Sequence, residues 1–174
     1  MIRLDISWFP QIDEIMIEAF PKVERRTSKE QAALFNLPCY QVYGMVEEGI
    51  LVAFLAVWEF DEIVFGEHLA TRGWKRGTGI GKELLLEYRN TIKKPLFLEV
   101  EKPTTKIADR RIKFYERLGF YLYDHLPYEQ PSFYHETPLP LNLMCNVEHL
   151  SDDTLKQYIN ILYTKVYKEK APWK

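Results

Sequence analysis

Residues 67–82, with the sequence EHLATRGWKRGTGIGK, decide the fold that we expect for the rest of the chain. They read as an apolar strand followed by a basic, glycine-rich turn, and the segment ELLLEY after them begins an amphipathic helix. Glycines at positions 77, 79 and 81 allow positive φ and leave the backbone open to a ligand. Backbone amides at the start of a helix bind anions, because the positive end of the helix dipole lies behind them. The stretch therefore predicts a phosphate or pyrophosphate site, surrounded by Arg72, Lys75, Arg76 and Lys82. The alternative is a flexible turn whose basic residues are only solvated.

Two common phosphate-binding loops do not fit this turn. A Walker A loop needs Ser or Thr after its Gly-Lys pair, whereas Gly81-Lys82 is followed by Glu83. A dinucleotide-binding fingerprint needs Gly-x-Gly-x-x-Gly, whereas these glycines alternate with single residues. The pattern that does fit is Arg-x-x-Gly-x-Gly, at residues 76–81. It resembles the pyrophosphate loop of the GNAT superfamily of acyl-CoA-dependent N-acyltransferases.

A second motif strengthens the resemblance. The sequence FYERLGF at residues 114–120 is similar to the fourth-helix motif of that superfamily, and a short strand at 95–101 lies between the two motifs. The resemblance extends in overall order from the N-terminus to Asp124, and its specific motifs lie within 67–120. It implies a mixed α/β GNAT fold, with a twisted, largely antiparallel sheet of about seven strands flanked by helices. It also implies a V-shaped cleft between the fourth and fifth strands.

A chain of 174 residues fits one domain over 1–174. Hydrophobic periodicity and turn residues predict its remaining strands and helices. The expected strands are 1–7, 40–47, 50–60, 63–71, 95–101, 120–123 and 139–145. The expected helices are 10–20, 28–36, 79–90, 104–118 and 151–167. Thr27 and Glu30 fit a capping box, and Glu48-Gly49 fits a hairpin turn. The charged Glu24-Arg25-Arg26 is expected to be a solvated connector, the alternative being contact with the substrate. The helix at 151–167 exceeds the minimal fold and is expected to pack on the domain or to form a homodimer contact.

Composition and charge narrow the class of protein. A hydrophobic content of 47% and an aromatic content of 14% argue against disorder. The net charge of −2 gives no general attraction for nucleic acid, so the basic turn is a local feature. Cys39 and Cys145 lack metal-type spacing and, with no signal peptide, predict a reducing cytoplasm. No apolar run approaches the ~20 residues of a membrane span. We expect a cytoplasmic protein that needs no metal and binds neither nucleic acid nor membrane.

Acyl transfer to an amine requires removal of a proton, because an alkylammonium group has a pKa of ~10.4. Deprotonation at neutral pH costs roughly 4–5 kcal/mol. The resemblance makes Glu67 the first candidate for the base, directly or through water. Its alternatives are a solvent-facing strand carboxylate or a contact to a cationic substrate. Glu99 and Glu101, on one face of the neighbouring strand, are further candidates for the base, for attracting an amine, or for simple surface exposure. Strand alternation predicts that His68 faces away from Glu67 as a structural histidine.

The resemblance also assigns the remaining site residues. Tyr115 matches the tyrosine that protonates, or hydrogen-bonds to, the departing CoA thiolate, the alternative being a core aromatic residue. Acetyl-CoA is expected to be bound by Leu69, Ala70, Thr71, Arg76, Gly77, Thr78, Gly79, Ile80, Gly81 and Lys82. The acceptor is expected to contact Glu99, Glu101, Tyr128 and Tyr134, the tyrosines lying in an aromatic loop at 126–138. Many members have Asn seven residues before the tyrosine, where this chain has Ala108, so that contact to the pantetheine arm is absent.

The resemblance therefore implies transfer of an acetyl group from acetyl-CoA, and we expect the acceptor to be a primary amine of a small molecule. Direct attack in a ternary complex is expected, because no Ser/His or Cys/His pair suggests an acyl-enzyme. One alternative is a protein or peptide N-acetyltransferase, which requires the 126–138 loop to leave an open groove. The other is an acyl-CoA-binding sensor without turnover. The sequence leaves open the identity of the acceptor and the choice among Glu67, Glu99, Glu101 and a water chain as the base.

Overall fold

The computed structural model describes residues 1–134 and 137–171, which form two compact units. Unit 1 contains residues 1–60 and 66–93, and unit 2 contains residues 61–65 together with the chain from residue 94 onward. Strand β4 (Val64–Thr71) begins in unit 2 and continues into unit 1. The expectation of one domain over 1–174 stays a prediction.

Unit 1 is built on strands in the order β1-β2-β3-β4. β1 (Ile2–Leu4), β2 (Tyr40–Glu47) and β3 (Ile50–Glu59) pair antiparallel. The β2–β3 hairpin turns through Glu48 and Gly49, which both have positive φ as a two-residue type I′ turn requires. β3 is buried from Leu51 to Trp58, so it forms the centre of the unit's core. A nearly continuous apolar sequence is what such a doubly covered strand needs.

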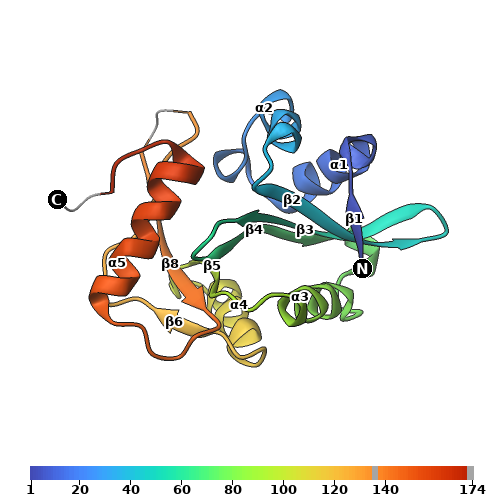
Figure 1. Ribbon diagram of the computed structural model, residues 1–174. Coiled ribbons are helices and arrows are strands. Elements are labelled where there is room, and N and C mark those ends of the chain that lie inside the picture. Colours follow the sequence, from blue (N-terminus) through green and yellow to red (C-terminus); the bar gives the residue numbers. More distant parts are fainter. Residues whose placement is uncertain (135–136, 172–174) are drawn as a thin grey trace. The chain divides into compact units, whose positions relative to one another are not determined.

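Helices cover both faces of this part of the sheet. Figure 1 shows α1 (Phe9–Ala19) and α2 (Ser28–Ala33) on one face of β2–β4 and α3 (Ile80–Thr91) on the other. The expected capping box at the start of α2 is confirmed: the Thr27 side chain accepts from Glu30 N–H, and Glu30 Oε2 accepts from Thr27 N–H at 3.0 Å. Short 3₁₀ turns lie at Ile6–Trp8, Lys22–Glu24, Leu34–Asn36 and Gly73–Lys75.

Unit 2 has strands in the order β5-β8-β6, with β7 also paired to β8. These strands are β5 (Leu96–Glu101), β6 (Tyr121–Tyr123), β7 (Glu129–Gln130) and β8 (Leu139–Cys145). The Val64 N–H at the start of β4 donates to the Pro95 carbonyl at 2.8 Å, and the β4–β5 pair is parallel. α4 (Lys106–Glu116) packs beside β5 and β6, while α5 (Asp152–Ile161) continues into a π-helical turn at Leu162–Tyr167.

The expected fold class is confirmed as a mixed α/β fold with a mostly antiparallel sheet flanked by helices. Several boundaries differ for local reasons. β1 stops before Asp5, because the Asp5 side chain accepts from Ser7 N–H and starts a 3₁₀ turn. β7 was not expected, because two residues carry no strand pattern. The helix expected at 104–118 ends at Glu116, and Gly119 follows with φ of +78°. The V-shaped cleft stays a prediction.

Candidate active site

The glycine-rich turn joins β4 to α3 in unit 1. Gly77 and Gly79 have φ of +77° and +88°, a region that favours glycine. A Cβ built on either residue would have no heavy atom within 4 Å. At Gly81, in contrast, such a Cβ would lie 3.1 Å from Thr71 Cγ2. The turn thus combines an open backbone surface at positions 77 and 79 with a tight contact between helix and strand at position 81.

The start of α3 presents amides that no side chain caps. Gly79 is the N-cap residue, and the first helical hydrogen bond runs from Glu83 N–H to the Gly79 carbonyl at 3.0 Å. Within residues 1–134 and 137–171, the N–H groups of Gly77, Gly79 and positions 80–82 donate to no acceptor. The N–H groups of Arg76 and Thr78 are engaged, with the carbonyls of Gly73 and Lys75. Five amides therefore remain for an anion, fewer than the seven of 76–82 that we expected to hold the pyrophosphate.

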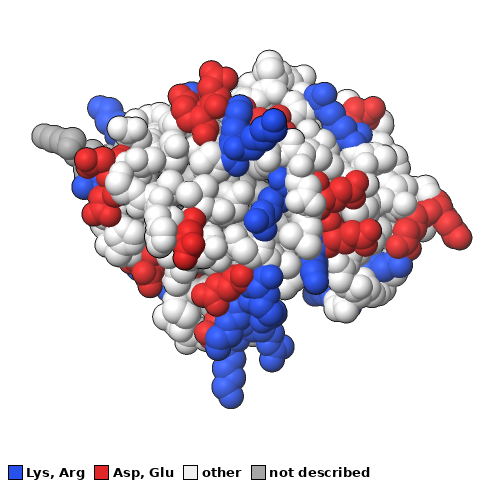
Figure 2. Space-filling model, turned by 60° about the horizontal axis from the view of Figure 1, so that its bottom comes forward, with Lys and Arg blue, Asp and Glu red and all other residues white. Residues whose placement is uncertain are grey.

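The positive charge expected around the turn is distributed unevenly. Arg72 and Lys75 are engaged with partners inside unit 1, and Arg76 pairs with Glu18 but keeps a side chain that is 55% exposed. Lys82 is exposed, and its side chain has no partner in the described part of the chain. The pairs are Arg72 Nε to Leu51 O (2.8 Å), Arg72 Nη2 to Glu14 (3.1 Å), Lys75 to Glu47 (2.6 Å) and Arg76 to Glu18 (3.4 Å). Figure 2 likewise shows basic and acidic side chains intermingled on the face that it displays. Arg76 and Lys82 are thus the cations best placed to meet a phosphate.

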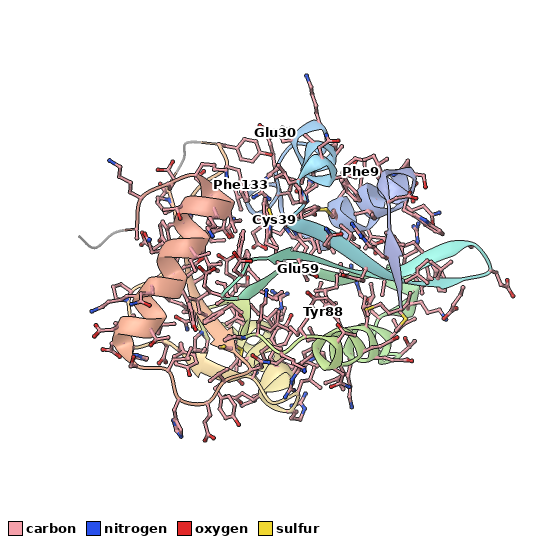
Figure 3. All side chains as sticks on the ribbon, viewed as in Figure 1. Phe9, Glu30, Cys39, Glu59, Tyr88 and Phe133 are labelled. Atoms are coloured by element: carbon pink, nitrogen blue, oxygen red, sulfur yellow. The ribbon has the colours of Figure 1, made fainter. Side chains whose placement is uncertain are left out.

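α3 is anchored to the sheet behind the turn. Leu84 and Leu85 are fully buried, and the Tyr88 hydroxyl donates to Glu59 Oε1 at 2.9 Å. The Tyr43 hydroxyl donates to the same oxygen at 3.2 Å. Figure 3 labels Glu59, at the end of β3, and Tyr88, on α3. These contacts anchor the helix whose N-terminus carries the free amides, so the candidate anion site begins a helix that is packed against the sheet.

Glu67 is a buried, ion-paired carboxylate rather than a solvent-facing one. Its side chain is 3% exposed, and its Oε1 accepts from Arg26 Nη1 at 2.7 Å. Its Oε2 accepts from Trp58 Nε1 at 3.0 Å and lies 3.7 Å from His68 Nδ1. The expectation that Glu24-Arg25-Arg26 is a solvated connector is therefore wrong at Arg26, whose side chain is 9% exposed. The expectation that His68 faces away from Glu67 is also wrong, because both side chains bind the same segment before α2.

The ionisation of this pair follows from burial and from Arg26. Burial disfavours the charged form of Glu67, but Arg26, His68 and the hydrogen bond from Trp58 outweigh it and lower the pKa of the carboxyl group. Burial lowers the pKa of His68, although Glu67 opposes that shift. A neutral His68 donates from Nε2 to the Glu24 carbonyl, at 3.2 Å. At neutral pH the pair is therefore a carboxylate beside a neutral imidazole.

Tyr115 lies on α4 in unit 2, with its ring between two aromatic neighbours. The ring centroids of Phe114 and Phe120 lie 5.2 Å and 6.0 Å from its own. Burial raises the pKa of the phenol, and Arg111 only partly offsets this. Among the residues that the structure describes, nothing forms a hydrogen bond with its hydroxyl. The side chain thus offers a protonated and uncommitted donor throughout the neutral range.

The residues expected at the acceptor lie in unit 2 and divide into two groups. Glu99 on β5 accepts hydrogen bonds from the hydroxyls of Tyr128 and Tyr167, the latter at 2.7 Å. Glu101 is half-buried and pairs with Arg111 at 3.2 Å. The structure thus brings Glu99 and Tyr128 together, and it shows Tyr134 half-buried with its N–H donated to Ser132 Oγ. Residues 135 and 136 of the same loop lie outside the described residues.

A Tyr128→Phe variant should lose about 2 kcal/mol of stability, because the half-buried Glu99 carboxylate then loses one of its donors. Chemical denaturation measures the loss. Tyr158→Phe is a matched control, since the Tyr158 ring packs 5.7 Å from Phe97 and its hydroxyl has no hydrogen-bond partner in the described residues. Equal stability in the two variants would contradict the structural role of the Tyr128–Glu99 hydrogen bond.

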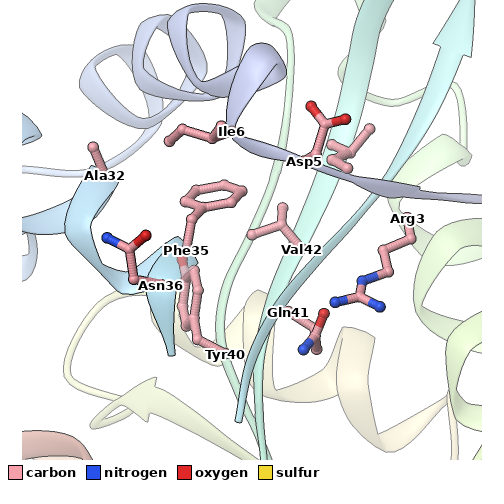
Figure 4. A pocket seen from close by; sticks show the side chains of 10 residues that line it. Arg3, Asp5, Ile6, Ala32, Phe35, Asn36, Tyr40, Gln41 and Val42 are labelled. Atoms are coloured by element: carbon pink, nitrogen blue, oxygen red, sulfur yellow. The ribbon is translucent and has the colours of Figure 1, made fainter. Parts of the chain in front are cut away.

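A separate pocket of about 500 Å³ opens beside β1 and β2 in unit 1. Figure 4 shows it between these strands and the segment around α2, with Phe35 and Tyr40 forming an aromatic wall. Arg3 and Asp5 contribute charges of both signs to its rim. None of the residues that we expected at the site lines it. Over the described ranges, no group of three His, Cys, Asp or Glu residues could hold a metal, and no helix could cross a membrane.

Comparison with known proteins gives a consistent family. Residues 38–122 match the model of the acetyltransferase (GNAT) domain, while no curated protein matches the sequence. A candidate acetyltransferase of the GNAT family from Bacteroides thetaiotaomicron shares 28% identity over 97% of this chain and 98% of its own, with a TM-score of 0.88. A ribosomal-protein alanine N-acetyltransferase from Escherichia coli has 19% identity over 87% of this chain and 96% of its own, and a TM-score of 0.65.

A candidate acetyltransferase from Salmonella typhimurium, solved with its cofactor acetyl-CoA, shares 20% identity over 87% of this chain and 96% of its own, with a TM-score of 0.60. At this identity, and at that of the Escherichia coli enzyme, the likeness supports the fold alone. The family match at 38–122 includes the glycine-rich turn, the start of α3 and the Tyr115 motif. Together with the fold, these findings show that the chain belongs to the GNAT superfamily of acetyltransferases.

Proposed function

We propose that this acetyltransferase moves an acetyl group from acetyl-CoA to a primary amine of a small molecule, by direct attack in a ternary complex. The observation that supports the cofactor best is the start of α3, where uncapped amides lie beside the open backbone of Gly77 and Gly79. Amides at a helix N-terminus suit a pyrophosphate. The exposed Lys82 adds a positive charge beside them.

Named residues of this chain are proposed to bind acetyl-CoA, to accept the proton of the amine and to assist the departure of the thiolate. The five free amides, of Gly77, Gly79 and positions 80–82, and the side chains of Arg76 and Lys82 bind the pyrophosphate, while the β4 backbone from Leu69 to Thr71 pairs with the pantetheine arm. Acetyl-CoA supplies the acetyl thioester. As the amine nitrogen bonds to the carbonyl carbon, the carbon–sulfur bond breaks and the amine proton passes to Glu67, directly or through water. Tyr115 donates its hydroxyl proton, or a hydrogen bond, to the leaving thiolate.

The residues that we propose for binding the acceptor amine lie in unit 2. Glu99 and Glu101 place two carboxylates on one face of β5, and both suit an ammonium group. Tyr128 and Tyr134 lie in the loop that follows, and the hydroxyl of Tyr128 holds Glu99 in place. We propose that Glu99 and Glu101 attract a cationic amine, with the tyrosines around it.

The two cysteines bear on where in the cell the protein works. Cys39 and Cys145 are free thiols in the structure, as suits a protein of the reducing cytoplasm. We propose a cytoplasmic enzyme that works without a metal and without nucleic-acid or membrane partners. The segment at 151–167, which exceeds the minimal fold, is the proposed contact of a homodimer.

The proposal is tested by release of free CoA from acetyl-CoA in the presence of a library of small primary amines and, separately, of peptides. We expect amine-dependent release with at least one small amine. Turnover of peptides alone would replace the small-molecule acceptor with a protein or peptide. Tight acetyl-CoA binding without turnover of any acceptor would support the non-catalytic sensor instead.

A further inference from the structure

We propose that Arg26 is a positioning residue for acetyl transfer: its guanidinium group, held between Glu67 and Trp58, fixes both the direction and the charge of the carboxylate that receives the acceptor's proton. The inference rests on the proposed role of Glu67 as the base. It adds a residue that lies outside the glycine-rich turn, the Tyr115 motif and the family-matched range of 38–122.

The two oxygens of Glu67 are held by different donors. Arg26 Nη1 bonds to Oε1 at 2.7 Å, and Trp58 Nε1 bonds to Oε2 at 3.0 Å. The Arg26 guanidinium carbon also lies 5.7 Å from the centroid of the Trp58 ring, within the range of a cation–π contact. The carboxylate cannot rotate without breaking one of these bonds. Its orientation is therefore set before any acceptor arrives.

Arg26 itself is fixed by the segment that carries it. On one side, Arg25 Nε bonds to the Phe20 carbonyl at 3.0 Å, and the Glu24 carbonyl accepts from His68 Nε2 at 3.2 Å. The ring of Phe20 lies edge-on to His68 at 4.8 Å. On the other side, Thr27 caps α2. The guanidinium group thus extends to Glu67 from a backbone that is hydrogen-bonded on both sides. This arrangement suits an ion pair that persists throughout the reaction.

Among the described residues, charged and titratable groups reach Glu67 from three parts of unit 1. Arg26 comes from the segment before α2, Tyr40 from β2, and His68 from β4 itself. Arg25 acts on His68 rather than on Glu67. Burial alone would raise the pKa of Glu67, and Arg26 is the largest opposing influence. Removal of the guanidinium charge should therefore raise the pKa of Glu67 and leave it protonated, and inactive as a base, at mildly acid pH.

The test compares Arg26→Gln, Arg26→Lys and the control Lys29→Gln, which removes an equal charge from an exposed side chain outside the ion pair and its tether. The pH profile of kcat/KM is measured from about pH 5 to about pH 9. In Arg26→Gln, kcat/KM should decrease as the pH is lowered, and its value at about pH 5 should be about 10-fold below its value at neutral pH. Arg26→Lys should keep the wild-type profile but lower kcat, since an ammonium group lacks the planar fork of a guanidinium. Lys29→Gln should keep both the wild-type profile and the wild-type kcat.

Two outcomes separate this inference from the proposed function. A Glu67→Gln variant with wild-type kcat would show that Glu67 is not the base. An inactive Glu67→Gln variant, together with an Arg26→Gln profile that superimposes on that of the wild type, would overturn the role of Arg26 alone. NMR titration of ¹³C-labelled glutamate gives a readout independent of turnover: the Glu67 carboxyl should titrate at higher pH in Arg26→Gln, and an unchanged midpoint would also overturn the inference.

Discussion

A Gly79→Val variant should bind acetyl-CoA at least about 100-fold more weakly than the wild type, because its new side chain enters the space that the diphosphate needs. Gly79 is the N-cap of α3, with φ of +88° and ψ of −2°. No heavy atom of the protein lies within 4 Å of a Cβ at this position. Because this Cβ lies in open space, we expect the steric effect of the substitution to fall on the ligand. Isothermal titration calorimetry measures the loss.

The backbone strain of this variant has a matched control in Gly49→Val. Gly49 lies in the β2–β3 hairpin with φ of +80°, and a Cβ there also has no heavy atom within 4 Å. Forcing a β-branched residue into the left-handed region costs roughly 1–2 kcal/mol, so both variants should lose similar stability. Only Gly79→Val should lose the cofactor. Equal loss of binding in both would mean that the strain alone weakens binding, and normal binding by Gly79→Val would remove the turn from the site.

The features that could be predicted from the sequence depend on patterns of a few adjacent residues. The capping box at Thr27 and Glu30 spans four residues, and the hairpin at Glu48 and Gly49 needs only two, so short-range chemistry determines both. The glycine-rich turn is of the same kind, because positive φ and an uncapped helix start depend on adjacent residues. The fold class followed from the resemblance of the glycine-rich turn and of residues 114–120 to motifs of the GNAT superfamily.

The partners of the site residues could not be predicted in this way. Arg26 and Glu67 are 41 positions apart, and no periodicity links a connector to a strand across that distance. Tyr167 and Glu99 are 68 positions apart, and Tyr167 lies in a π-helical turn that sequence patterns do not distinguish from an α-helix. Buried carboxylates need donors, but the sequence does not show which donors the tertiary fold will supply. For Glu67 this choice changes the chemistry, because an arginine partner lowers the pKa that burial alone would raise.

The second large effect is expected from Tyr115→Phe, which should lower kcat about 100-fold, since a positioned proton donor contributes typically 10²–10⁴-fold. The ring contacts with Phe114 and Phe120 involve no hydroxyl, so the fold should be retained. The hydroxyl has no hydrogen-bond partner in the described residues, and its removal leaves no protein group unsatisfied. Acetyl-CoA affinity should therefore stay within about threefold of wild type, because the lost interaction forms only as the thiolate departs.

Tyr121→Phe provides the comparison for this variant. Tyr121 on β6 is 38% exposed, and its hydroxyl also lacks a hydrogen-bond partner in the described residues, so its loss should leave kcat unchanged. Because burial raises the pKa of Tyr115, its hydroxyl stays protonated up to alkaline pH, and the 100-fold difference between Tyr115→Phe and wild type should persist across the neutral range. Steady-state release of CoA gives kcat, and calorimetry gives the affinity for acetyl-CoA. If kcat and the affinity for acetyl-CoA declined equally in Tyr115→Phe, the tyrosine would only support the fold. A donor to the leaving group acts on the transition state and not on the bound cofactor.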